Sequence, residues 1–125
     1  MQSVLFFIIA LALCAGCGKS TAEKDKIPPV VQISSPLNGQ SFSPGQSIII
    51  SGTITDDQYI AETHIHVSNR NTGELLMDVH LYPGGKTGNF NQPVSATAGI
   101  DYKIQVIAKD RAVNETRGTV EVSCN

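Results

Sequence analysis

The chain has 125 residues with 9 basic and 11 acidic side chains, a formal net charge of −2, and no tryptophan. The basic residues form no run or stripe, so nucleic acid is not an expected partner. Aromatic residues make up only 6% of the chain, which argues against a glycan-binding surface built on exposed aromatic platforms.

An apolar run at the N-terminus is typical of a secretory signal. Residues 4–13 contain no polar side chain, and two small residues follow before Cys17. The run is far shorter than the ~20 apolar residues that a membrane-spanning helix needs. A buried core helix is the alternative, but it would continue into residues 18–26, which are polar and have no apolar period. We predict that residues 1–16 are a signal peptide.

The end of this segment resembles the lipobox of bacterial lipoproteins. The matching residues are Ala15, Gly16 and Cys17. The resemblance implies that Cys17 carries a lipid and that residues 17–29 tether a domain to the cell envelope, at the outer membrane or the cell surface. Cys14 stands where Leu is usual, and the first three residues include no Lys or Arg. A secreted or periplasmic protein cut near Gly16 is therefore the alternative.

The cysteine count agrees with lipidation. Cys14 would leave with the signal and Cys17 would be acylated, so Cys124 would have no intrachain partner. Without the lipid, a bridge between Cys17 and Cys124 is the alternative. Residues 18–29 are mostly polar and, fully extended, reach about 40 Å.

After Pro29 the apolar residues recur with a period of two, and Gly, Pro, Asn or Asp bound each run. This pattern indicates short antiparallel strands. About seven strands within residues 30–125, a length common for one domain, predict an all-β sandwich. The expected strands cover residues 30–34, 47–55, 61–68, 75–82, 88–94, 102–110 and 118–123.

Three segments resemble bacterial immunoglobulin-like domains: residues 29–39 (PVVQISSPLNG), 48–57 (IIISGTITDD) and 101–115 (DYKIQVIAKDRAVNE). Those families share a P-x-V-x-I-x-x-P-x-x-G opening, a T-x-x-D-D/N segment and a Y-x-I/V-x-V-x-A-x-D-x-A-G-N segment. The resemblance implies an immunoglobulin-like antiparallel β-sandwich and says almost nothing of function. Val113 stands where the family usually has Gly.

Two residues of these segments have expected structural roles. Tyr102 begins a strand, which suits a tyrosine corner whose hydroxyl bonds to nearby backbone. Gly52 shares a strand face with Ile50 and Ile54, so it leaves room for a facing side chain or marks a bulge.

All three histidines of the chain are expected on one exposed surface. His64 and His66 lie on one face of a strand because side chains alternate. Burying the apolar set of the next strand leaves Asp78 and His80 outward, and the resulting register pairs His64 with His80 and His66 with Asp78. Imidazole and carboxylate are ligands of Zn²⁺ and Cu²⁺. The alternative is a solvated sheet face without metal.

A second candidate cation site consists of Asp56, Asp57, Asp110 and Asn114. In an immunoglobulin-like sandwich the two loops that carry them lie at the same end, where their oxygens could bind Ca²⁺. The alternative is that they accept hydrogen bonds from the amides of their own turns.

The chain lacks the motifs G-x-S-x-G, H-E-x-x-H and C-x-x-C, and no Gly-rich phosphate loop follows a strand. We therefore expect no enzyme but a membrane-anchored module that binds or spaces an envelope protein or glycan. A lipoprotein that binds Zn²⁺ or Cu²⁺ through the histidine surface is the alternative function.

Overall fold

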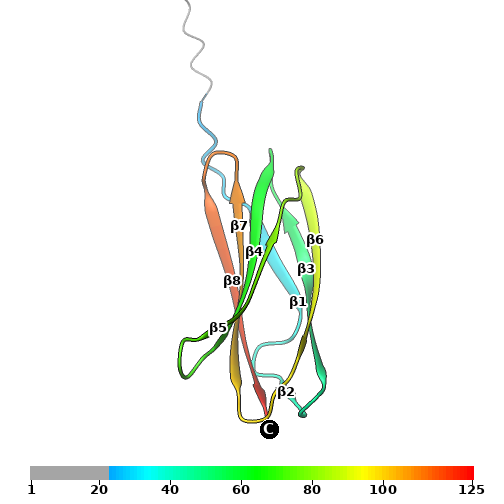
Figure 1. Ribbon diagram of the computed structural model, residues 1–125. Helices are drawn as coiled ribbons and strands as arrows, with labels where there is room; N and C mark the ends of the chain where they lie inside the picture. The colour runs from blue at the N-terminus through cyan, green and yellow to red at the C-terminus, as the bar shows by residue number, and fades with distance from the viewer. Residues whose placement is uncertain (1–22) are drawn as a thin grey trace, which may run out of the picture.

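The computed structural model describes residues 23–125, so the expected signal peptide (1–16) and Cys17 lie outside the described residues. The described chain folds into two β-sheets that pack face to face (Figure 1). Within these residues no helix has the length and apolar content that a membrane crossing requires. The all-β sandwich that the sequence predicts is confirmed.

One sheet has three strands in the order β1-β3-β6, and the other has five in the order β2-β8-β7-β4-β5. Neighbouring strands are antiparallel except for β2, which runs parallel to β8. The strands are β1 (Val30–Ser35), β2 (Ser41–Phe42), β3 (Ser47–Thr55), β4 (Ile60–Asn69), β5 (Leu75–Leu81), β6 (Thr87–Ser95), β7 (Asp101–Asp110) and β8 (Glu115–Cys124).

The hydrophobic core fills the space between the two sheets. Because side chains alternate along a strand, every second residue of the central strands points into this space. On β7 this gives buried residues at Tyr102, Ile104, Val106 and Ala108, as the sequence pattern predicts. The other large core residues are Phe42, Ile48, Ile50, Ile54, Ile60, Ile65, Val67, Phe90 and Val122.

Gly52 lies where the strands of the smaller sheet leave no room for a side chain. A Cβ atom at this position would lie 2.0 Å from the backbone oxygen of Gln32 and 2.6 Å from Cζ of Phe90. Phe90, on β6, lies directly opposite Gly52, and its ring occupies the space that a side chain would fill. The close approach of a facing side chain expected at Gly52 is confirmed.

The tyrosine corner is also confirmed. The hydroxyl of Tyr102 accepts a hydrogen bond from the backbone amide of Thr97 at 2.8 Å, and Tyr102 is buried at the start of β7. The bond therefore fixes the connection between β6 and β7 to the core.

The structure has one strand more than the seven expected. β2 contains only Ser41 and Phe42, which is too short to produce a periodic pattern in the sequence. It pairs with the last residues of β8, and Phe42 fills the core there. β8 also begins earlier than expected, at Glu115, because its polar first residues pair with β7.

Part of the expected tether (17–29) contacts the sandwich. The side-chain amide of Asn114 donates to the backbone oxygen of Asp25 at 3.0 Å, and Pro29 is buried. The chain thus enters at the end that carries the β3–β4 and β7–β8 loops, while the β4–β5 turn and the C-terminus lie at the opposite end (Figure 1).

Candidate functional site

The β4–β5 hairpin brings the three histidines together in the register that the sequence predicts. His64 lies opposite His80, and His66 lies opposite Asp78. The neighbouring residues Ile65 and Val67 point the other way, into the core. We call the outward cluster the histidine face; it consists of Glu62, His64, His66, Asp78 and His80.

The side chains of the histidine face form a continuous series of contacts. Asp78 places one carboxylate oxygen 3.1 Å from Nε2 of His66 and the other 3.1 Å from Nε2 of His80. Glu62 contacts Nε2 of His64 and lies 3.7 Å from Nδ1 of His80. The rings of His64 and His80 lie against each other at an angle of 35°, with centroids 3.9 Å apart. Each carboxylate therefore links two imidazoles.

Both carboxylates are favoured in their ionised form. The hydrogen bond with His64 holds the pKa of Glu62 below its ordinary value, and the hydrogen bond with His80 does the same for the pKa of Asp78. Nearby positive charge adds to the effect, while partial desolvation opposes it. Glu62 and Asp78 are therefore both ionised at neutral pH.

Glu62 is the member of this cluster that the sequence pattern did not reveal. The sequence could have indicated it, because Glu62 precedes His64 by two residues and alternation places both side chains on the same face of the strand. A β-bulge next to Glu62 interrupts the alternation of side chains along β4. Ile60 and Glu62 are two residues apart but pair with consecutive residues of β7. The extra residue lets Ile60 enter the core while Glu62 stays outward.

A shallow pocket of about 200 Å³ adjoins the histidine face. Ile107 lies opposite His64 on β7 and is only 8% exposed, although it is on the outer side of the sheet. Glu115 pairs with Lys109 at 3.9 Å and with Arg117 at 3.4 Å along the pocket's other side.

The second candidate group divides into two parts. Asp110 and Asn114 bind each other: one carboxylate oxygen of Asp110 accepts from the Asn114 backbone amide at 2.8 Å and the other from its side-chain amide at 2.7 Å. These contacts are the local turn bonds of the alternative interpretation.

Asp56 and Asp57 lie with Asp25 rather than with Asp110. One oxygen of each of these three carboxylates lies within 4.8 Å of the other two. One Asp56 oxygen accepts from the amides of Gln58 and Tyr59 at 2.9 and 2.8 Å, which shapes the β3–β4 loop. Calcium binding at this end of the molecule stays a prediction.

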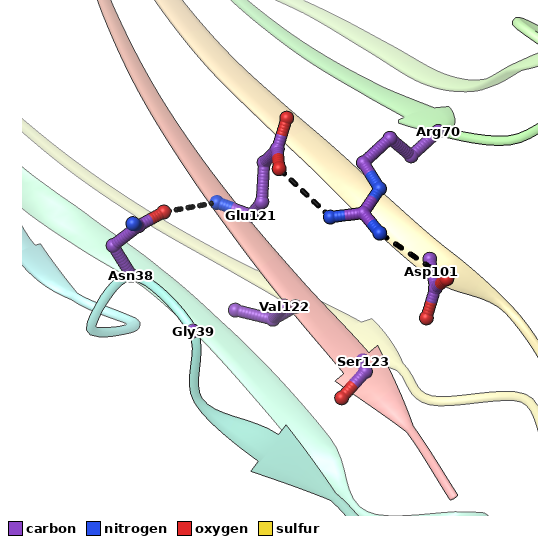
Figure 2. A pocket seen from close by; sticks show the side chains of 7 residues that line it. All are labelled: Asn38, Gly39, Arg70, Asp101, Glu121, Val122 and Ser123. Carbon is purple, nitrogen blue, oxygen red and sulfur yellow. Dashed lines mark hydrogen bonds and ion pairs between the residues drawn. The ribbon is translucent and has the colours of Figure 1, made fainter.

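A third polar site lies at the opposite end, around Arg70 (Figure 2). Its guanidinium pairs with Glu121 at 2.8 Å and with Asp101 at 3.5 Å, and the bond with Glu121 raises the pKa of Arg70 above its ordinary value. Asn38 accepts a hydrogen bond from the Glu121 amide at 2.9 Å. These contacts join the β4–β5 turn, the β1–β2 loop and β8, so we assign them a structural role.

The match to a family model decides the classification. Residues 29–122 match the model of the bacterial Ig domain. The chain belongs to this family. Membership confirms the immunoglobulin-like sandwich, and a bacterial Ig domain is in general a binding or structural module. No curated protein matches the chain.

Solved structures similar to this bacterial Ig domain agree in fold. The fibronectin(III)-like modules of Clostridium thermocellum CbhA are 20% identical with a TM-score of 0.54, over 77% of this chain and 46% of theirs. OgpA from Akkermansia muciniphila is 11% identical with a TM-score of 0.56, over 79% of this chain and 29% of its own.

A superoxide reductase (neelaredoxin) from Ignicoccus hospitalis is 10% identical with a TM-score of 0.52, over 79% of this chain and 81% of its own. At these identities the likeness extends to the fold alone. The chain spans less than half the length of the CbhA and OgpA structures that it matches.

Proposed function

We propose that this bacterial Ig domain is a non-enzymatic module that a lipid on Cys17 holds at the cell envelope, where it binds an envelope protein or glycan. The observation that carries the proposal is the attachment of the N-terminal segment to one end of the sandwich. With a lipid on Cys17, the opposite end would be directed away from the membrane.

The bond between Asn114 and Asp25 shortens the free tether. Eight peptide units separate Cys17 from Asp25, and fully extended they span about 26 Å. This is less than the reach expected of the whole segment 18–29. A lipid-bearing Cys17 would therefore keep the β3–β4 and β7–β8 loops close to the membrane.

The end far from the tether offers exposed apolar side chains for a partner. Leu75 is 54% exposed and Leu76 is 40% exposed on β5, which is an open edge of the larger sheet. Leu37, in the loop after β1, is 70% exposed at the same end. An open strand edge with apolar residues supports binding by strand addition or by surface contact.

Fractionation and intact mass of the membrane-extracted protein test the anchor. We expect the natural chain to sediment with membranes and to carry the mass of a diacylglyceryl cysteine at its N-terminus. Cys17→Ser should abolish the lipid mass and release the protein, whereas Cys14→Leu, which restores the usual lipobox residue, should keep both.

Membrane attachment that persists unchanged in Cys17→Ser would contradict the lipid anchor. The binding role is tested separately by a pull-down from intact envelopes. Recovery of no protein or glycan above background would contradict that role while leaving the anchor in place.

A further inference from the structure

The histidine face gathers more metal-binding groups than its structural role in the sheet requires. Its five side chains come from two adjacent strands and lie on the solvent side, so none of them fills the core. Two overlapping groups are arranged closely enough to share an ion: Glu62, His64 and His80, and His64, His66 and Asp78.

The distances suit an ion after small side-chain rotations. Within each group one ligand atom of every residue lies within 4.8 Å of the others. Two ligand atoms on a tetrahedral Zn²⁺ are about 3.4 Å apart, because each bond is about 2.1 Å long. Rotation about side-chain torsions can close this gap, since the side chains of His64, His66 and His80 are 25%, 31% and 42% exposed.

The ligand chemistry selects the kind of ion. Imidazole suits Zn²⁺ and Cu²⁺, whereas Ca²⁺ and Mg²⁺ take oxygen ligands. Carboxylates that contact a ligating imidazole fix its orientation and strengthen its binding. In either group one carboxylate would be a ligand and the other would support one: Asp78 contacts His80, and Glu62 contacts His64.

The charge around the cluster also favours a cation. The basic residues nearest to it, Lys109 and Arg117, both pair with Glu115. Together with Glu62 and Asp78, this gives three carboxylates against two basic groups when the imidazoles are neutral. Ile107, opposite His64 on β7, contributes an apolar wall to the adjoining pocket.

We propose that the histidine face binds one divalent transition-metal ion, Zn²⁺ or Cu²⁺, with His64 as the ligand common to both groups. A single ion follows because the two groups share His64, and a neutral imidazole has only one nitrogen with a free lone pair. The proposal does not depend on the lipid anchor or on a binding partner.

Titration calorimetry of the purified full chain in detergent, stripped with chelator and then given ZnCl₂ or CuCl₂, tests the site. We expect one ion per chain. His64→Ala should lower the affinity by about 100-fold or more, because loss of a ligand costs at least as much as loss of a residue that only supports one. His80→Ala should lower it by about 10-fold or more for the same reason.

Gln105→Ala is the matched control, because Gln105 lies opposite His66 on the same outer face and contacts Thr119. The Gln105→Ala variant should bind Zn²⁺ and Cu²⁺ with the same affinity as the natural chain. Paramagnetic resonance of the Cu²⁺-loaded protein should show coupling to imidazole nitrogen that weakens in His64→Ala.

Failure of the natural chain to bind either ion would overturn the proposal. So would an unchanged affinity in a folded His64→Ala variant, which would place the ion elsewhere. Circular dichroism establishes that the variants are folded, and the more exposed His80 provides a second variant if His64→Ala does not fold.

Discussion

Val113 adopts a backbone conformation that its side chain opposes. It lies in the β7–β8 loop with φ of 69°, the only positive φ at a residue other than glycine among residues 23–125. Left-handed backbone costs an L-residue roughly 1–2 kcal/mol, and a β-branched side chain is especially disfavoured there. The side chain is 69% exposed, so packing does not compensate for the strain.

We predict that Val113→Gly raises the free energy of unfolding by about 1 kcal/mol. Removing the side chain relieves the strain, and the greater freedom of glycine in the unfolded chain offsets part of the gain. Urea denaturation measures the change. Ala112→Gly is the control. It increases the conformational entropy of the unfolded chain in the same way, but the φ of Ala112 is not positive, so no strain is relieved and the free energy of unfolding should fall. A lower free energy of unfolding in Val113→Gly would contradict the claim that the positive φ of Val113 strains the folded protein.

The unusual residue at position 113 is recognisable from the sequence, because the family motif has Gly there. The contact between Glu62 and His64 cannot be recognised from the sequence, because it depends on side-chain torsions and on the bulge beside Glu62. At the residue scale, side-chain direction was predictable from alternation, and hydrogen-bond partners mostly were not.

At the scale of elements, the smaller sheet depends on Gly52. The strand β3 is central, with β1 on one side and β6 on the other, and Gly52 faces both Gln32 and Phe90. The irregularity in β1, between Ile33 and Ser35, lies opposite the same point. The three strands therefore fit together only if position 52 has no side chain.

We predict that Gly52→Ala lowers the free energy of unfolding by about 3 kcal/mol or more, because the new methyl group would overlap a backbone oxygen that cannot rotate away. Thermal or urea denaturation measures the loss. Gly85→Ala is the matched control, since a Cβ there meets nothing within 4 Å and its φ is not positive. Equal stability of the two variants would contradict the proposed packing.

Strand positions and the β4–β5 register followed from the sequence because one face of each strand must be buried. Together with the short turn between the two strands, this requirement pairs His64 with His80. It gives no information where burial is not periodic, as in the two-residue β2 and the polar start of β8. Pro93 lies within β6, where a strand was expected, and β6 tolerates proline because it is a sheet edge.

At the scale of the whole molecule, the two ends of the sandwich differ. Asp25 is held beside the start of β8, and Cys124 is buried at the other end of that strand. The nine residue steps of β8 span about 30 Å. Eight peptide units from Asp25 back to Cys17 span about 26 Å at most. Because a disulfide adds about 6 Å between the two Cα atoms, a bridge between Cys17 and Cys124 would require the segment from Cys17 to Asp25 to be almost fully extended.

The proposed anchor predicts how the domain stands on a membrane. Gln58 is exposed in the β3–β4 loop at the tether end, and Thr72 is exposed in the β4–β5 turn at the other end, separated by the length of β4. Nine peptide units of strand span about 30 Å. We predict that a fluorophore at Gln58→Cys transfers energy to a membrane dye much more efficiently than one at Thr72→Cys.

Labelling is selective in the lipidated protein because Cys17 would carry the lipid and Cys124 is only 2% exposed. In a Cys17→Ser background both labels should show equally low transfer, since the domain would no longer be held at the surface. Equal, high transfer from both positions in the anchored protein would mean that the sandwich lies flat on the membrane, which contradicts an upright domain with its far end directed to a partner.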